Sequence, residues 1–223
     1  MKTYSAYGLR VESAFDLPEL PRIDEPNAPT DVVFQRGEVD PVPESVSGKG
    51  GRRIQAQPDV CRLSYESYGS FLVESGEEVT FDPKSPDVTA KKVIRRLLEN
   101  EMLGVLMHQR GRLVLHASAV LIDESVVLFL GPRGVGKSTT AAAFHQQGYP
   151  IMEDDIVSVR LEDGVPMVDA GVPELRLNPD VVDALEFEET KTYADDGGTE
   201  KCYHYIDDMP DSVPLETCYV LNI

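Results

Sequence analysis

A glycine-rich stretch in the middle of the chain has the residue types and spacing of a phosphate-binding loop. Residues 131–138 read Gly-Pro-Arg-Gly-Val-Gly-Lys-Ser, which matches the pattern Gly-x-x-x-x-Gly-Lys-Ser/Thr of a P-loop. The glycines let the backbone curl until successive N–H groups point at one phosphate. Lys137 then reaches the β- and γ-phosphates, and the Ser138 hydroxyl ligates Mg²⁺. The predicted cofactors are therefore ATP and Mg²⁺, and the predicted nucleotide-binding residues are Gly131, Pro132, Arg133, Gly134, Val135, Gly136, Lys137, Ser138 and Thr139.

The segments on either side of this loop fit the same interpretation. Residues 126–130 are five consecutive apolar residues, which is typical of a buried strand, and residues 139–147 favour a helix. A helix that begins near Lys137 points the positive end of its dipole at the bound phosphate. The alternative is a plain glycine-rich turn between a strand and a helix, and the Lys-Ser pair that ends the loop argues against it.

Phosphoryl transfer also needs a carboxylate that holds the metal and a group that orients the nucleophile. An acidic triplet, residues 153–155 (Glu-Asp-Asp), follows the P-loop helix between the apolar pairs 151–152 and 156–157. Such triplets arise by chance in a chain with 39 acidic residues, but solvent-facing runs seldom lie between apolar pairs. An apolar strand is predicted over residues 112–122, and the turn at residues 123–125 is expected to join it to the P-loop strand in a hairpin. His116 on this strand is either a core histidine or a member of the site.

The charge of the chain excludes several classes of partner. Its 223 residues include 39 acidic and 21 basic side chains, which gives a formal net charge of −18. Nucleic acids and anionic membranes are polyanions, so we expect neither as a partner, and ATP must bind at a locally positive site. The acidic residues are spread along the chain. This resembles a halophilic protein, in which salt screens self-repulsion, and it fits an ordinary acidic cytosolic protein equally well.

The cysteines and the N-terminus indicate a cytoplasmic protein. The three cysteines form no Cys-x-x-Cys pattern, so neither a disulfide framework nor a zinc site is predicted. The first residues lack the apolar core of a signal peptide, and no apolar run is long enough to span a membrane.

The predicted fold class is α/β, with a β-rich module ahead of a nucleotide-binding core. Residues 1–83 contain short strand-like runs separated by turn residues and are expected to form the small N-terminal module. Residues 84–111 contain a long amphipathic helix that connects this module to the core. Residues 112–223 are expected to form the P-loop core, a mixed sheet with helices. Because this core ends directly on an apolar strand, we expect that more chain normally follows it.

The order of three features resembles one known family. A histidine on an apolar strand (His116-Ala-Ser-Ala-Val), the P-loop and the Asp154-Asp155 pair follow one another in the chain. This order is similar to the HPr serine kinase/phosphorylase family and its relatives, which share a nucleotide-binding core with phosphoenolpyruvate carboxykinases. The resemblance covers residues 112–160 and extends at most to residue 180. Residues 4–9 (Tyr-Ser-Ala-Tyr-Gly-Leu) also resemble the opening strand of HPr-kinase-like relatives from peptide-modification clusters.

The resemblance implies a role for each of these residues. Positioning and charge stabilisation are most of what phosphoryl transfer needs, and the implied roles supply both. By this resemblance, Lys137 holds the ATP phosphates, Ser138 and Asp155 hold Mg²⁺, Asp154 accepts the proton of a serine hydroxyl, and His116 lies near the transferred phosphate.

The sequence departs from the family pattern in two ways that bear on its implied activity and substrate. The first 83 residues do not resemble those of the HPr kinases, and their Glu-x-Arg-Gly signature has only a faint counterpart at Glu174-Leu-Arg176. Both departures count against phosphorylase activity and against HPr as the substrate.

The functional hypothesis is therefore an ATP-dependent serine kinase whose protein, peptide or small-molecule acceptor the sequence does not identify. One alternative is a regulatory module that senses or hydrolyses ATP without an acceptor. A more distant alternative is a carboxykinase-type enzyme that acts on small organic acids. HPr-kinase-like proteins can assemble as oligomers, so a homo-oligomer is a further expectation.

Overall fold

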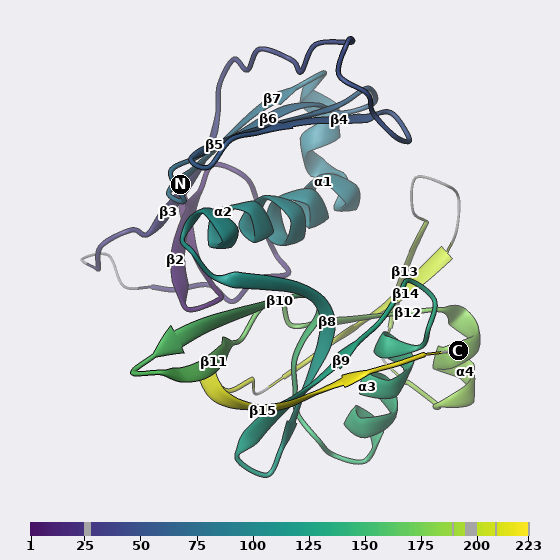
Figure 1. Cartoon of the computed structure of the whole chain (residues 1–223). Helices are drawn as coiled ribbons and strands as arrows, with labels where there is room; N and C mark the ends of the chain where they lie inside the picture. Colours follow the sequence, from purple (N-terminus) through teal and green to yellow (C-terminus); the bar gives the residue numbers. More distant parts are fainter. Residues whose placement is uncertain (25–27, 189, 195–199, 208, 223) are drawn as a thin grey trace. The chain divides into compact units, whose positions relative to one another are not determined.

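The computed structural model describes residues 1–24, 28–188, 190–194, 200–207 and 209–222. Contacts divide the chain into two compact units, Met1–Gly111 and Arg112–Ile223 (Figure 1). Each unit contains its own β-sheet structure, helices and buried apolar residues.

The first unit is built on one seven-stranded mixed sheet with the strand order β1-β2-β3-β7-β6-β5-β4. Neighbouring strands are antiparallel except at β2–β3 and β3–β7, which are parallel. The rings of Phe71 and Phe81 stack within its core, with centroids 4.1 Å apart. The strands are β1 (Lys2–Ala6), β2 (Leu9–Ser13), β3 (Val32–Arg36), β4 (Arg52–Ala56), β5 (Val60–Tyr65), β6 (Gly69–Glu74) and β7 (Glu78–Pro83).

The helix expected near the end of this unit is present, but it is not one regular α-helix. A 3₁₀ turn (Pro86–Ala90) precedes α1 (Lys92–Arg96) and α2 (Leu103–Gln109), and a π-helical stretch (Leu97–Met102) joins the two. Apolar side chains at helical spacing are fully buried, which agrees with the amphipathic pattern of the sequence. They are Ile94, Leu98, Met102, Leu103 and Leu106.

The second unit contains a closed five-stranded barrel in the order β10-β11-β15-β9-β8. All neighbours are antiparallel except β15 and β9, which are parallel. The hairpin expected between the histidine strand and the P-loop strand is confirmed, because Ile122 of β8 pairs with Ser125 of β9. The strands are β8 (Leu113–Ile122), β9 (Ser125–Leu130), β10 (Ile151–Glu162), β11 (Val165–Asp169) and β15 (Ser212–Val220).

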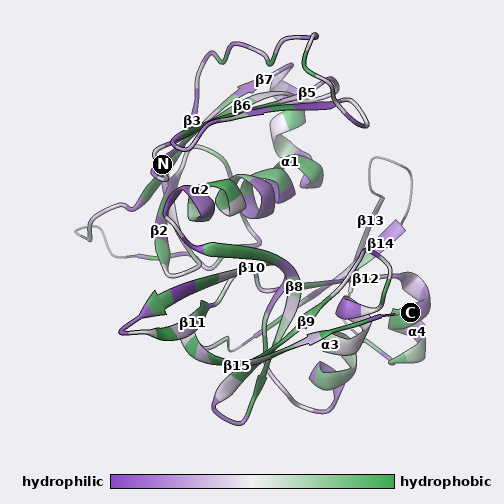
Figure 2. Cartoon of the chain, in the orientation of Figure 1, coloured by the Kyte–Doolittle hydropathy of each residue, from purple (hydrophilic) through white to green (hydrophobic). Residues whose placement is uncertain are grey.

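The P-loop strand β9 divides its side chains between two cores, because successive residues of a strand point to opposite faces. Val126 and Leu128 pack with apolar residues of the other barrel strands. Val127 and Phe129 pack in a second core together with helix α3 (Lys137–Gln146). Figure 2 shows hydrophobic residues along the barrel strands, among them β8 and β10.

A separate three-stranded antiparallel sheet, β12-β14-β13, completes the second unit. Leu175 and Leu177 of this sheet are buried in the core that contains α3, so the sheet and the P-loop helix are held together by apolar contacts. The elements are β12 (Glu174–Leu177), helix α4 (Pro179–Ala184), β13 (Lys191–Ala194) and β14 (Glu200–Tyr205).

The predicted α/β fold class is wrong. The structure is mostly β: of the described residues, 45% are in strands and 18% in helices, and the strands form three sheets. A buried strand followed by a helix suggested an α/β core, but α3 covers one face of β9 while the other face lines the barrel. Most neighbouring strands here are antiparallel, and only a parallel pair needs the crossover helix that defines an α/β fold.

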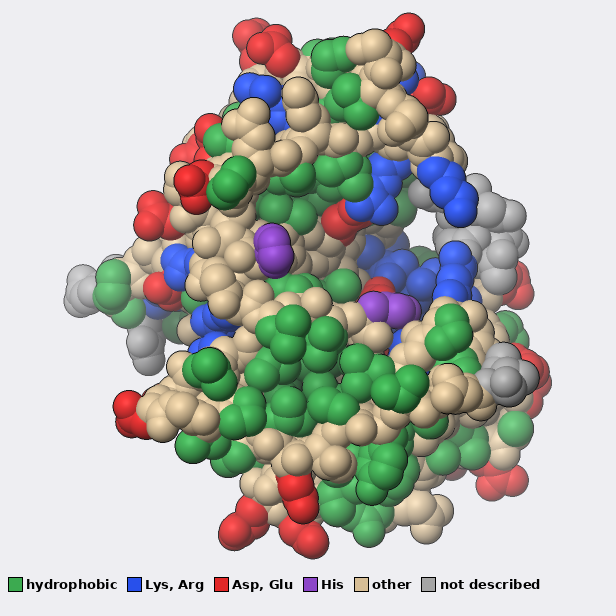
Figure 3. Space-filling model, in the orientation of Figure 1, with side chains coloured by type: hydrophobic (Ala, Val, Ile, Leu, Met, Phe, Trp, Pro, Cys, Tyr) green, Lys and Arg blue, Asp and Glu red, His purple; other side chains and the backbone are tan. Residues whose placement is uncertain are grey.

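The acidic side chains on the face shown in Figure 3 do not form one patch. Asp and Glu lie there at many separate places, mostly near the edge of the face. Among the described residues, no helix combines the length and the apolar character needed to cross a bilayer.

A buried carboxylate ties the N-terminal loop of the first unit to its helix. Glu19, only 7% exposed, accepts hydrogen bonds from Lys92 Nζ at 2.9 Å and from Arg95 Nε at 2.9 Å. Burial by itself raises the pKa of Glu19, but the hydrogen bonds from Arg95 and Lys92 outweigh burial and lower the pKa to about 2. The folded state therefore favours the ionised carboxylate over a wide pH range.

We predict that Glu19→Gln lowers the free energy of unfolding at pH 7 by about 2–3 kcal/mol, because it removes the buried carboxylate that Lys92 and Arg95 both hydrogen-bond. A lowered pKa stabilises the folded state above the usual glutamate pKa of about 4.3, and this stabilisation disappears as pH falls toward 2. Urea titrations of wild type and variant between pH 7 and pH 3 should show the difference shrinking below about pH 4.3.

The control is Asp16→Asn, since Asp16 forms an exposed ion pair with Lys2 at 2.6 Å. We expect this change to cost less than about 1 kcal/mol. An equal decrease in the free energy of unfolding in both variants would show that burial adds nothing to the interaction of Glu19 with Lys92 and Arg95.

Candidate functional site

The predicted P-loop joins the end of β9 to the start of α3 in a backbone that needs glycine. Gly131, Gly134 and Gly136 have φ of 149°, 88° and 102°, which residues with a Cβ rarely adopt. At Gly131 an added Cβ would lie 2.7 Å from the carbonyl oxygen of Leu221. The loop leads into the N-terminus of a ten-residue helix, whose positive dipole end favours a phosphate.

The side chain of Lys137 lies inside the loop. It is only 6% exposed, and its Nζ donates hydrogen bonds to the carbonyl oxygens of Gly131 at 2.9 Å and Pro132 at 3.2 Å. These two acceptors are neutral and do not cancel the charge of the ammonium group. A phosphate in the loop would cancel it and would gain a charge-assisted hydrogen bond.

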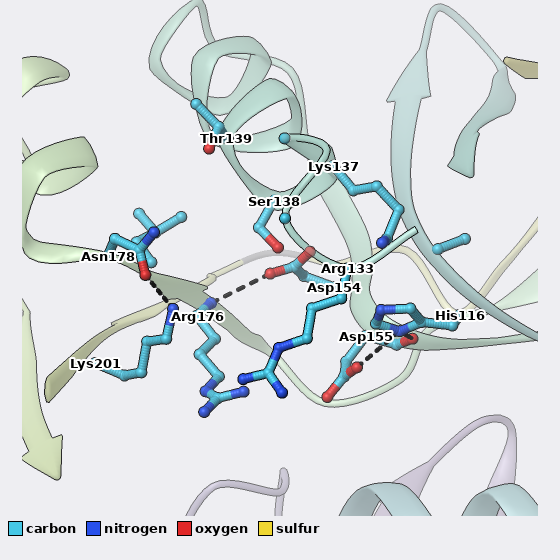
Figure 4. Close-up of a pocket in the computed structure, with 14 residues that line it drawn as sticks. His116, Arg133, Lys137, Ser138, Thr139, Asp154, Asp155, Arg176, Asn178 and Lys201 are labelled. Atoms are coloured by element: carbon cyan, nitrogen blue, oxygen red, sulfur yellow. Dashed lines mark hydrogen bonds and ion pairs between the residues drawn. The ribbon is translucent and has the colours of Figure 1, made fainter. Parts of the chain in front are cut away.

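Strand pairing brings Asp154 beside the loop. β10 pairs with β8 so that Asp154 stands opposite Ser118, whose Oγ donates a 2.5 Å hydrogen bond to Oδ1 of Asp154. Oδ2 accepts a hydrogen bond from the backbone N–H of Arg176 at 3.2 Å, and the Ser138 hydroxyl also hydrogen-bonds this carboxyl group. Three separate segments therefore hold the carboxyl group, and Figure 4 shows its hydrogen bond with Arg176.

The surroundings of Asp154 shift its proton affinity. Burial raises the pKa of Asp154, and the negative charge of Asp155 adds to this effect. The hydrogen bonds from Ser118, the Arg176 N–H and Ser138 oppose the shift, but the pKa still lies above the usual range for aspartate. A carboxylate with a raised pKa suits a group that accepts a proton during a reaction.

Asp155 and His116 form a second pair at the site. Nδ1 of His116 lies 2.9 Å from the carbonyl oxygen and 3.0 Å from Oδ1 of Asp155. The hydrogen bond with the Asp155 side chain raises the pKa of His116 and outweighs the opposing effect of burial. Asp155 has φ of 150°, an uncommon value for a residue other than glycine. His116 is thus a member of the site and not a core histidine, since 52% of its side chain is exposed.

The third acidic residue of the triplet has a different position. Glu153 is 1% exposed, and its Oε2 accepts a 2.6 Å hydrogen bond from the backbone N–H of Val172. Its Oε1 accepts a 3.0 Å hydrogen bond from the backbone N–H of Asp154. Glu153 therefore holds the backbone behind the site and does not line the pocket.

One pocket of the second unit is lined by most of the predicted site residues. Its volume is about 370 Å³, and four of its 14 lining residues are basic while two are acidic. This reverses the balance of the whole chain, in which 39 acidic residues outnumber 21 basic ones. The pocket is therefore the locally positive site that an anion needs in an acidic protein. Its lining residues are His116, Ala117, Arg133, Gly134, Gly136, Lys137, Ser138, Thr139, Asp154, Asp155, Arg176, Leu177, Asn178 and Lys201.

The sequence did not predict three polar residues of this pocket: Arg176, Asn178 and Lys201. They come from the three-stranded sheet and the residue that follows β12. The alternation of β12, in which Leu175 and Leu177 are buried, shows that Arg176 faces the other way, but it does not show what that face meets. Of the predicted loop residues, Gly131, Pro132 and Val135 support the loop from outside the pocket lining.

The residues present fit a magnesium ion. Mg²⁺ binds oxygen ligands and is usually held by one or two carboxylates together with substrate phosphates and water. Ser138, Asp154 and Asp155 bring such oxygens to the pocket. Within the described ranges, no group of three or more His, Cys, Asp or Glu is placed to hold a metal ion, so such a site would depend on the phosphates of a ligand.

We predict that Ser118→Ala raises the pKa of Asp154 further, because it removes a hydrogen bond that favours the ionised carboxylate. A ¹³C NMR titration of the aspartate carboxyl groups measures this shift. Ser158→Ala is the matched control, since Ser158 is also fully buried but contacts Arg112. An Asp154 pKa that is unchanged in Ser118→Ala would contradict the assigned contact.

We also predict that Asp155→Asn lowers the pKa of His116 toward the usual value of about 6.5, because the neutral amide no longer stabilises the imidazolium. The shift can be followed in the ¹H–¹⁵N NMR signals of the imidazole. Asp123→Asn, in the turn between β8 and β9, should leave the His116 titration unchanged. A His116 pKa that does not respond to Asp155→Asn would exclude the pair in solution.

No protein-family model and no curated protein matches the sequence. Among solved structures, the chain is similar to the HPr(Ser) kinase/phosphatase from Coxiella burnetii, with 16% sequence identity and a TM-score of 0.31. The match covers 48% of this chain and 64% of the Coxiella chain. The chain thus shows a partial structural resemblance to an HPr(Ser) kinase/phosphatase, and a similarity of this size carries no argument about function.

Proposed function

We propose that the second unit binds a magnesium–nucleoside triphosphate, with ATP as the expected nucleotide, and transfers its γ-phosphoryl group to a hydroxyl group. The observation that carries the proposal is the common pocket of Lys137 and Asp154. A buried ammonium group inside a glycine loop and a fixed carboxyl group of raised pKa face the same 370 Å³ space. A phosphate site beside a proton acceptor is the minimum that phosphoryl transfer requires.

Each polar group of the pocket has a part in this reaction. The loop amides and Lys137 bind the β- and γ-phosphates, and the dipole of α3 adds to their attraction. Bound Mg²⁺ neutralises phosphate charge, and Ser138 with Asp155 would hold it. Asp154 accepts the proton of the attacking hydroxyl, and His116, held by Asp155, places positive charge near the transferred group.

The contact between Ser138 and Asp154 favours a second assignment of the two aspartates. In that assignment Asp154 holds Mg²⁺ together with Ser138, and Asp155 accepts the proton with His116 as its partner. The two assignments differ in which Asn variant changes the magnesium requirement.

Transfer from γ-³²P-ATP tests the proposal, with free serine, a mixed peptide pool and a soluble protein fraction as acceptors, at low and at high salt. Asp154→Asn should slow transfer by roughly 100-fold or more and should leave the Kd for MgATP within a few-fold, because a base acts on the chemical step. Lys137→Ala should weaken MgATP binding by ~10-fold or more, since it removes a charge-assisted bond. Asp155→Asn should raise the Mg²⁺ concentration needed for half-maximal transfer.

Asp123→Asn is the control for loss of an acidic group away from the pocket. If Asp154→Asn and not Asp155→Asn changes the magnesium requirement, the second assignment holds. The kinase proposal would be wrong if the protein binds MgATP but transfers phosphate to none of the acceptors, and if Asp154→Asn does not change ATP turnover. That result would favour the nucleotide-sensing module.

A further inference from the structure

Arg176 and Lys201 form a second group of cations at the pocket, called the cationic wall below, which the P-loop does not supply. Along β12, Leu175 and Leu177 are buried against the core of α3, so Arg176 points to the opposite face of the three-stranded sheet. In the pairing of β12 with β14, Arg176 stands opposite Tyr203 and Leu177 opposite Cys202. This register places Lys201 of β14 on the same face as Arg176.

Lys201 is oriented toward the pocket by a neighbouring side chain. Its Nζ donates a hydrogen bond to Oδ1 of Asn178, the residue that follows β12. All three side chains, those of Arg176, Asn178 and Lys201, line the pocket that also contains the P-loop. Figure 4 shows Arg176 and Lys201 on the side of Asp154 away from His116.

The carboxyl group of Asp154 lies between the start of the P-loop helix and the backbone of Arg176. It hydrogen-bonds Ser138 of the P-loop on one side and the backbone N–H of Arg176 on the other. If Asp154 lies at the transferred phosphoryl group, the P-loop side holds the donor, and the side of Arg176 holds the acceptor. The cationic wall then meets the acceptor and not the nucleotide.

We infer that Arg176 and Lys201 form a second oxyanion subsite, and that the acceptor carries a phosphate or carboxylate group close to the hydroxyl that is phosphorylated. This inference rests on the proposed function and adds the class of acceptor. A guanidinium group binds such oxyanions through two parallel hydrogen bonds, and a lysine contributes a point charge beside it. An acidic chain gains from this arrangement, because its overall field repels an anionic acceptor that lacks a local positive site.

Inorganic phosphate is the probe. Phosphate is titrated by calorimetry into protein saturated with Mg²⁺ and the non-hydrolysable analogue β,γ-imido-ATP, at constant ionic strength. We expect saturable binding of one phosphate to the wild type. Arg176→Gln and Lys201→Gln should each weaken it by ~5-fold or more, while the Kd for the analogue changes less than about two-fold. Arg176→Lys should retain part of the affinity, because it keeps the charge and loses the paired geometry.

Lys191→Gln is the matched control, since it removes one positive charge from β13 of the same sheet but does not line the pocket. It should leave phosphate binding unchanged. Thermal unfolding of every variant shows whether it is folded. If Arg176→Gln does not fold, the phosphate affinity of Lys201→Gln tests the subsite by itself.

Two results would overturn the inference. One is the absence of saturable phosphate binding to the nucleotide-saturated protein. The other is a loss of analogue binding in Arg176→Gln with phosphate binding unchanged, which would assign the wall to the phosphates of the nucleotide.

Failure of the proposed function itself would look different, because the wild type would then not bind the analogue. In that case phosphate is titrated into the free protein. A site lost in Arg176→Gln but kept in Lys137→Ala would still establish the second subsite, and a single site lost only in Lys137→Ala would exclude it.

Discussion

The central constraint on the second unit is the pairing of β8 with both β9 and β10. Ala117 stands opposite Leu130, the last residue before the P-loop, and opposite Asp155. Ser118, one position further along β8, stands opposite Asp154. One short piece of one strand therefore fixes the distance between the start of the loop and both aspartates. A shift of one residue in the register of β10 on β8 would turn the Asp154 side chain to the other face of β10, away from Ser118 and the loop.

The electrostatics of the pocket follow from this arrangement. Asp154 is buried and receives hydrogen bonds from three segments, whereas Asp155 faces His116 and remains partly exposed. Burial raises the pKa of Asp154, and Asp155 is paired with His116, so the two acids have different surroundings although they are adjacent in the chain. The loop ammonium of Lys137 and the wall of Arg176 and Lys201 surround this pair with positive charge. The proposed chemistry depends on that local reversal of a net charge of −18.

The parts of the structure that the sequence predicted are those with local signals. The strand, glycine turn and helix at residues 125–146, the hairpin of β8 and β9 and the burial pattern of the helix after residue 92 depend on neighbouring residues, and all are present. Barrel closure was missed because it requires β15 to pair in parallel with β9, with Leu215 opposite Val126, and no local pattern encodes a contact so distant in the chain.

The apolar pairs around residues 153–155 indicated a buried acidic segment, but alternation could not show that Glu153 supports the backbone while its neighbours line the pocket. Arg176 and Lys201 were missed for a similar reason, since a strand pattern gives the face of a side chain and not what that face meets.

The central claim is that the pocket of the second unit binds the phosphates of a nucleotide, and the chemical shifts of backbone amides on addition of MgATP test it most directly. We predict the largest shifts at Gly134, Gly136 and Ser138, whose N–H groups lie in or next to the loop, with smaller shifts at Asp154 and Arg176. Shifts confined to residues outside the pocket, or no saturable shift at millimolar MgATP, would contradict it.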